Sequence, residues 1–143
     1  METLKSKLIE EIGNNTTEVQ ALLDHFTFAN YYKGEHLKNS NTEDYLFFIS
    51  SGFVRIYYLT EHKQNNEINI AFIPEDNFIT DVDYFFGNGS RKLKIQALEN
   101  VTTYRIKKEE YDTLVKKFPI IEKFAINRLL EFSRQLLKKD YLL

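Results

Sequence analysis

Residues 45–57 read YLFFISSGFVRIY, two short apolar runs that meet at Ser51-Gly52. Aromatic and β-branched residues of this kind favour strands, and glycine between the runs favours a tight turn. The stretch predicts consecutive strands at Tyr45–Ser50 and Phe53–Leu59. Comparable runs bounded by turn signals follow at 68–73, 93–98 and 101–106. Many short strands with frequent turns are typical of a sandwich, jelly roll or barrel.

The segments on either side of this β-rich body have helical periodicity. Leu4, Leu8 and Ile12 recur at four-residue steps, and a second short apolar pattern follows up to residue 25. After residue 106 the helical period returns through 108–117 and again from Pro119 to about Tyr141. We predict one mainly β domain over residues 1–143, with N-terminal helices at 1–25, a β-roll at 26–106 and C-terminal helices at 107–143.

The last helix has a wider apolar surface than docking on the β-roll requires. One stripe and an adjoining one are both apolar, and a second copy of the chain is the simplest partner for the extra width. We therefore predict a homodimer through this helix, although both stripes could also be buried within one chain. The first stripe contains Ile121, Ala125, Leu129, Phe132 and Leu136, and the second contains Ile126, Leu130 and Leu137.

Composition excludes several kinds of function. The chain has no cysteine and a formal net charge of -2, so thiol chemistry is excluded and a polyanionic partner is not indicated. Residues 1–12 do not resemble a signal peptide and no membrane-spanning stretch is present, so we expect a soluble, cytoplasmic protein without a membrane partner. The nine Tyr and twelve Phe are expected to pack in the core rather than to stack on nucleic-acid bases.

The sequence shows no catalytic or metal-binding pattern. His25, His36 and His62 are far apart in sequence, whereas a metal site of the cupin kind needs close histidine pairs and a carboxylate. Asp81 and Asp83 could act as paired acids, but the first turn of a short helix explains them better. We predict that the chain is not an enzyme and holds no metal or other cofactor. A cupin-like enzyme ranks third, after the two non-enzymatic functions described below.

Three segments together resemble the β-roll of the Crp/Fnr (catabolite-activator) family. They are residues 32–37 (YKGEHL), 45–57 and 95–100 (IQALEN), and the similarity extends in order over about residues 20–140. Gly34 and Gly52 match two turns where the family pattern has glycine. The resemblance implies a double-stranded β-helix, also called a jelly roll or β-roll, followed by a long dimerisation helix.

The family's phosphate-binding cassette is only partly matched. It begins Phe-Gly-Glu and ends with an arginine before a small residue, whereas this chain has residues 78–80 (FIT) and aligns Arg91 only after an insertion, with Lys92 beside it. Arg91 could instead pair with one of the neighbouring acids. Cyclic nucleotide thus remains a possible ligand, but we do not expect tight binding. The resemblance suggests these ligand contacts: Phe78, Thr80, Arg91, Lys92, Asn127 and Arg128.

We therefore expect a sensor and dimerisation domain of a Crp/Fnr-type transcription regulator. Ligand occupancy at the cassette would bias how two copies pair through the last helix. Family members bind DNA through a C-terminal helix-turn-helix domain, and none follows within the 143 residues, so DNA binding would require a further domain. The alternative function is a stand-alone receptor for a different small molecule.

Overall fold

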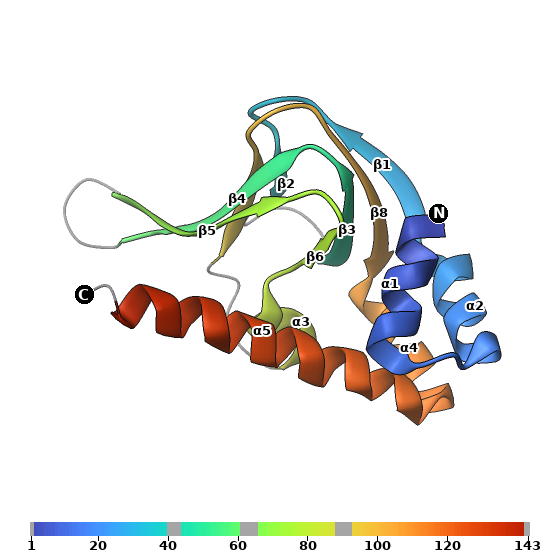
Figure 1. Cartoon of the computed structure of the whole chain (residues 1–143). Coiled ribbons are helices and arrows are strands. Elements are labelled where there is room, and N and C mark those ends of the chain that lie inside the picture. Colours follow the sequence, from blue (N-terminus) through green and yellow to red (C-terminus); the bar gives the residue numbers. More distant parts are fainter. Residues whose placement is uncertain (1, 40–43, 61–65, 88–92, 142–143) are drawn as a thin grey trace.

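The computed structural model describes residues 2–39, 44–60, 66–87 and 93–141. Helices precede and follow a two-sheet β-body, as the periodicity predicts (Figure 1). In chain order the elements are α1 Glu2–Ile12, α2 Thr16–His25, β1 Thr27–Tyr31, β2 His36–Lys38, β3 Tyr45–Ser51, β4 Phe53–Leu59, β5 Glu67–Pro74, β6 Asn77–Ile79, α3 Val82–Phe86, β7 Lys94–Ala97, β8 Val101–Lys107, α4 Lys108–Lys117, the 3-10 turn η1 Pro119–Ile121 and α5 Glu122–Tyr141.

The strands form two antiparallel four-stranded sheets, in the orders β1-β8-β3-β6 and β2-β7-β4-β5. This arrangement confirms the predicted β-roll and its flanking helices. The five predicted strands are all present, with ends that differ by a residue or less. The short strands β1, β2 and β6 were not among the predicted ones, because β2 and β6 have three residues each and β1 mixes polar with apolar residues.

Strand β3 explains why the chain has two hydrophobic cores. Successive side chains of a strand point to opposite faces, so Phe47 and Ile49 enter the space between the two sheets while Leu46 and Phe48 face the helices. All four side chains are at most 1% exposed. The predicted packing of adjacent rings on opposite faces is confirmed for Phe47 and Phe48, and α1, α2, α4 and α5 cover the outer face of the first sheet.

Two glycines allow the turns that the family pattern requires. Gly34 and Gly52 have φ angles of 90° and 106°, which side-chain-bearing residues rarely adopt. At Gly52 space is also limiting, because an added Cβ would lie 2.6 Å from the carbonyl oxygen of Asn100. The turn between β3 and β4 therefore depends on glycine for both its backbone conformation and its close approach to the segment before β8.

The C-terminal helix runs below the roll and passes α3 (Figure 1). It begins at Glu122 rather than at Pro119, since Pro119–Ile121 forms a separate 3-10 turn. Helix α5 contacts α1, α3 and β5, so it links the N-terminus to the segment around residue 80.

Candidate functional site

The segment after β6 is the one that the resemblance aligns with the phosphate-binding cassette. Asp81 caps α3, with its side chain accepting from the Tyr84 amide at 3.5 Å, so the predicted helix N-terminal role of this acid is confirmed. The Thr80 hydroxyl donates to the Tyr45 carbonyl at 2.7 Å, and Thr80 is 4% exposed. Thr80 therefore anchors the cassette to β3. The other predicted cassette residues, Arg91 and Lys92, lie outside the described residues.

A buried ionic cluster lies beneath this segment. Lys38 donates to Asp44 at 2.9 Å, and its Nζ is 3.9 Å from Asp81 Oδ2. Burial raises the pKa of the Asp81 carboxyl above its usual range, while the nearby Lys38 ammonium opposes that shift. Two acids share one buried lysine, so the segment under the cassette has no surplus of positive charge to attract a phosphate.

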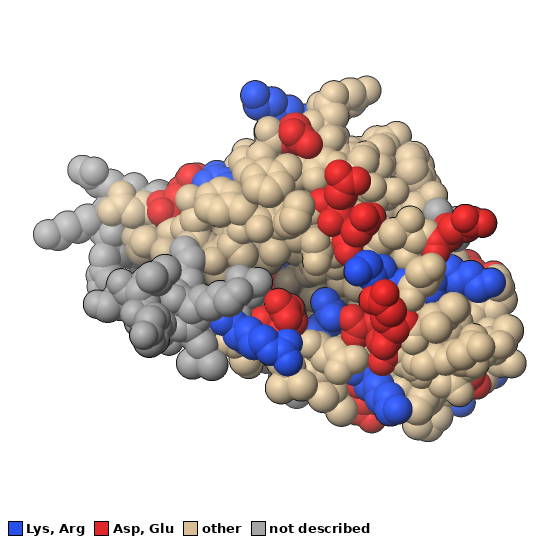
Figure 2. Space-filling model, viewed as in Figure 1, with Lys and Arg blue, Asp and Glu red and all other residues tan. Residues whose placement is uncertain are grey.

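A cavity of about 80 Å³ opens between the second sheet, the cassette and α5. Figure 2 shows the molecular surface hollowed between the roll and the helix below it, with charged side chains along the lower edge. Most of the lining is apolar, and Arg128 is the only cationic lining residue in the described part of the chain. The lining residues are Leu46, Ile56, Ile70, Ala71, Ile73, Asn77, Phe78, Ile79, Thr80, Val82, Arg128 and Glu131.

The two predicted ligand contacts on α5, Asn127 and Arg128, have different surroundings. Asn127 Nδ2 donates to Glu11 Oε2 at 2.8 Å and to the Glu11 carbonyl at 3.2 Å, so it fastens α5 to the end of α1. Arg128 also binds Glu11 through Nη2, yet it lines the cavity. Phe78, Thr80 and Arg128 therefore share one cavity, while Asn127 is held at α1. The sequence pattern gave no signal for Glu11, an acid on an amphipathic surface helix.

Aromatic rings hold α5 against the cassette. Phe124 is 1% exposed, and its ring meets that of Phe78 edge-on with centroids 4.7 Å apart. The Arg128 guanidinium lies over both rings, at 5.6 Å from Phe78 and 5.5 Å from Phe124. Phe124 was not in the predicted stripes, although it is the main docking residue of the helix.

The predicted dimer residues of α5 differ in exposure. Ile121, predicted as a dimer residue, is fully buried in the core of its own chain, and Ala125 is half-buried. Leu129 is 43% exposed, and the second predicted stripe contributes Ile126 at 54% and Leu130 at 50%. The side chains of Phe132, Leu136 and Leu137 lie outside those described. Ile126, Leu129 and Leu130 form the exposed α5 patch.

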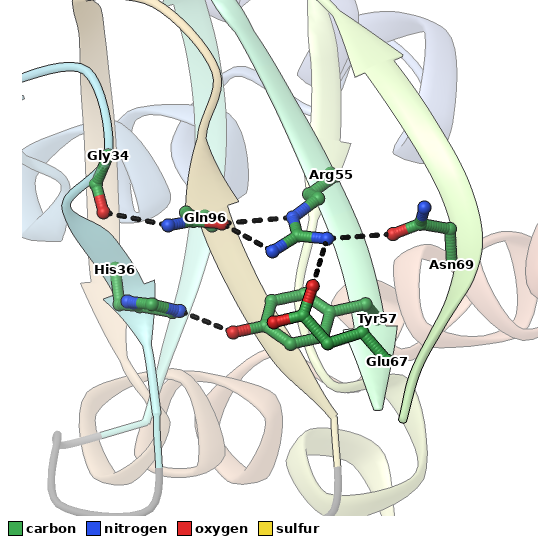
Figure 3. Close-up of polar contacts among 7 residues, drawn as sticks. All are labelled: Gly34, His36, Arg55, Tyr57, Glu67, Asn69 and Gln96. Carbon is green, nitrogen blue, oxygen red and sulfur yellow. Dashed lines mark hydrogen bonds and ion pairs between the residues drawn. The ribbon is translucent and has the colours of Figure 1, made fainter. Parts of the chain in front are cut away.

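A polar network covers the outer face of the second sheet (Figure 3). Arg55 donates to Gln96 through Nε and Nη2, at 2.9 and 2.6 Å, and through Nη1 to Glu67 at 2.9 Å and Asn69 at 3.1 Å. Its guanidinium also stacks 3.9 Å from the centroid of the Tyr57 ring. These contacts join β4, β5 and β7, and they use the donors of Arg55 so fully that we interpret the network as a brace for the sheet.

His36 extends this network to β2. Its Nε2 and the Tyr57 hydroxyl share a hydrogen bond of 2.6 Å, and Gln96 Nε2 donates to the Gly34 carbonyl at 2.9 Å. Burial lowers the pKa of His36 below its usual value, and the positive charges of Lys94 and Arg55 lower it further. The ring is therefore held in its neutral form. The described residues contain no group of three His, Cys, Asp or Glu side chains placed to hold a metal ion.

Comparison with known proteins identifies the class. Residues 28–118 match the model of the cyclic nucleotide-binding domain, which is more than half of the chain, and the chain therefore belongs to the cyclic nucleotide-binding domain family. No curated protein sequence matches the chain. Within the described residues, no helix is long and apolar enough to cross a membrane.

Solved structures with the same fold include sensor domains of the Crp/Fnr kind. A CooA mutant from Carboxydothermus hydrogenoformans is 24% identical, with a TM-score of 0.67 over 94% of this chain and 82% of that one. The sensor domain of the regulator DNR from Pseudomonas aeruginosa is 20% identical, with a TM-score of 0.69 over 99% and 91%. The catabolite activator protein of Thermus thermophilus is 20% identical, with a TM-score of 0.72. The match covers 94% of this chain but only 62% of that protein.

Proposed function

We propose that this chain is the non-catalytic sensor and dimerisation domain of a cytoplasmic Crp/Fnr-type transcription regulator, with a cassette that does not bind cyclic nucleotide tightly. The observation that carries the proposal is that α5 contacts the cassette, where sensing would occur, and also has an exposed face through which two copies could pair. Phe124 docks one face of the helix on the cassette residue Phe78, while Ile126 and Leu130 leave another face open to solvent. A change at the cassette can therefore move a surface that is free to contact a second copy.

The exposed α5 patch supports a homodimer. Three large apolar side chains that are each at least 43% exposed lie within five consecutive residues of one helix. Adjacent exposed apolar residues of this kind mark interaction sites more often than single ones do, and closed two-fold pairing is the commonest form of assembly. Isologous contact between two α5 helices would bury the patch on both copies at once.

Analytical ultracentrifugation of the full chain tests this assembly. We expect a dimer at tens of micromolar concentration, and Leu130→Glu should dissociate it because the introduced carboxylate would be buried without a partner. Lys5→Glu changes an exposed residue on α1, away from the α5 patch, and it should leave the dimer intact. A monomeric parent chain, or a Leu130→Glu variant that remains dimeric, would contradict the proposed interface.

Three features support weak or absent cyclic nucleotide binding. The Thr80 side chain replaces the family's glutamate and already donates to the Tyr45 carbonyl. Asp81 lies buried beneath the cassette beside Lys38. The cavity of about 80 Å³ is also much smaller than ordinary pockets for ligands of nucleotide size.

A thermal-shift titration with cyclic AMP and cyclic GMP to millimolar concentration tests this part of the proposal. We expect no shift of the unfolding midpoint. Ligand at about 100 times its Kd should stabilise a fold by about 2.7 kcal/mol, which raises the midpoint by several degrees in a domain of this size. A shift of that size, abolished by Arg91→Ala, would show that the cassette binds cyclic nucleotide in spite of its altered sequence.

A stand-alone receptor for a different small molecule is the second candidate. The apolar cavity beside Arg128 favours it, because this lining suits a ligand other than a nucleotide. Both candidates share the same sensing step and differ in output, because only the first acts on transcription. Mass spectrometry of the protein as purified, under native and then denaturing conditions, would detect a small molecule retained in the cavity.

A further inference from the structure

Among the described residues, the cavity between the roll and α5 combines an apolar body with one cation, Arg128, at its edge. Ile70 and Ala71 of β5 and Phe78 of β6 contribute apolar walls, and Arg128 approaches from the helix. A lining of this kind suits a ligand with one negative charge and a short hydrocarbon part, since each portion meets a surface of matching polarity.

Arg128, which lines this cavity, has one buried N–H donor without a partner among the described residues. Its Nη2 binds Glu11, but its Nε is buried and has no hydrogen-bond partner among the described residues. A buried N–H without an acceptor is costly, so an acceptor that reaches it is favoured strongly. A carboxylate is the matching group, because arginine presents adjacent N–H donors in a planar fork.

The balance of charge and volume limits the ligand further. Within the described lining, the negative charge of Glu131 offsets the positive charge of Arg128, so these two residues oppose a group with two negative charges. A water molecule needs roughly 10–15 Å³ of this kind of volume, and about 80 Å³ therefore holds on the order of five to eight groups of that size.

We propose that this cavity binds a short-chain monocarboxylic acid, with the hydrocarbon tail against Ala71 and Phe78 and the carboxylate on Arg128. The proposal rests on the sensing function above and names the class of ligand. It also supplies the link to output, because Arg128 lies two residues before the exposed Leu130 and holds α5 to α1 through Glu11. A ligand that changes the Arg128 contact changes the seating of the dimerisation helix.

Titration of the full chain with hexanoate, followed by calorimetry and by methyl NMR, tests the proposal. Hexanamide and acetate are the matched ligands, since the first lacks the charge and the second lacks the tail. We expect saturable binding of hexanoate, binding of both controls at least tenfold weaker, and chemical-shift changes at the Ala71 methyl and the neighbouring Ile70 methyls.

Two variants separate the contributions of charge and space. Arg128→Gln removes the cation and Ala71→Leu fills the cavity without touching the ion pair, so each should weaken hexanoate binding at least tenfold. Lys123→Gln removes a positive charge from an exposed site on the same helix and should bind as the parent does. Equal binding of hexanoate and hexanamide, or full binding by both Arg128→Gln and Ala71→Leu, would overturn the proposal.

Failure of this inference can be told apart from failure of the proposed function. A chain that dimerises through the α5 patch but does not bind hexanoate would disprove the ligand class alone. A chain that binds hexanoate in the cavity as a stable monomer would support the ligand class and disprove the proposed dimerisation.

Discussion

Lys38 and Asp44 form an ion pair of 2.9 Å whose side chains are only 2% and 6% exposed. The pair joins strand β2 to the residue that precedes β3, and Asp81 brings the cassette to the same lysine. A charge buried this deeply is tolerated only while its partner remains.

Removing the lysine should therefore destabilise the fold severely. We expect Lys38→Met to lower the free energy of unfolding by about 3–5 kcal/mol, because Asp44 and Asp81 would stay buried without their cation. Urea unfolding followed by circular dichroism measures this change. Lys38→Met combined with Asp44→Leu should recover part of the loss, and an equal or larger loss in the double variant would show that the carboxylate is not the source of the cost.

Gly52 and Gly34 provide a matched pair for separating backbone strain from steric overlap. Both have positive φ, but an added Cβ finds nothing within 4 Å at Gly34 and lies 2.6 Å from the Asn100 carbonyl oxygen at Gly52. Gly34→Ala should cost about 1–3 kcal/mol of stability through strain alone. Gly52→Ala should cost clearly more in the same urea experiment, and equal costs would mean that the loop before β8 yields to the new methyl group.

The neutral His36 predicts a loss of stability in mild acid. Its pKa in the folded chain is lowered from the ordinary value of 6.5, so protonation favours the unfolded state. The stability that His36 contributes is present above pH 6.5 and is lost as the pH falls toward and below its folded-state pKa. Unfolding measured between pH 7.5 and 5 should show a shallower fall for His36→Gln than for the parent chain.

His25→Gln is the control for this pH effect, since His25 ends α2 and donates to the Ala21 carbonyl within the same helix. The variant should keep the steeper fall of the parent. Asp81 changes the stability with pH in the opposite direction, because its raised pKa makes its contribution to stability largest at low pH. Both variants retain Asp81, so its effect is the same in each. Identical pH profiles for the parent and His36→Gln would remove His36 as the cause.

Phe124 should govern the attachment of α5 to the cassette. Phe124→Ala removes a ring that is 1% exposed, and a loss of about 3–5 kcal/mol is expected for such a truncation. A double-mutant cycle with Phe78→Leu and Phe124→Leu should give a coupling of about 0.5–1.5 kcal/mol for their edge-on contact. Additive effects in that cycle would show that the two rings do not act together.

Local pattern made much of the fold predictable. The alternation in residues 45–57 defines β3 and β4, and the four-residue steps of Leu4, Leu8 and Ile12 define α1 with all three side chains buried. The strands β2 and β6 escaped prediction because three residues are too few to show a period. They are held in place by pairing with β7 and β3.

The candidate site was predictable only in part. The predicted contacts Phe78, Thr80 and Arg128 line one cavity, whereas Ala71, which lines it too, belongs to a strand whose sequence carries no sign of ligand contact. Asn127 faces Glu11 because α1 returns to α5 across 116 positions of sequence, and no local rule contains that contact.

The sequence by itself determined the longer helices and strands and their amphipathic faces, since these depend on periods of two and 3.6 residues within short windows. Only the tertiary structure decided which part of each face is covered. It buried Ile121 and Phe124 while leaving Ile126, Leu129 and Leu130 exposed, and it buried the Nε of Arg128 without an acceptor among the described residues. Those outcomes depend on contacts between distant segments, because burial is a property of the packed chain rather than of any one helix or strand.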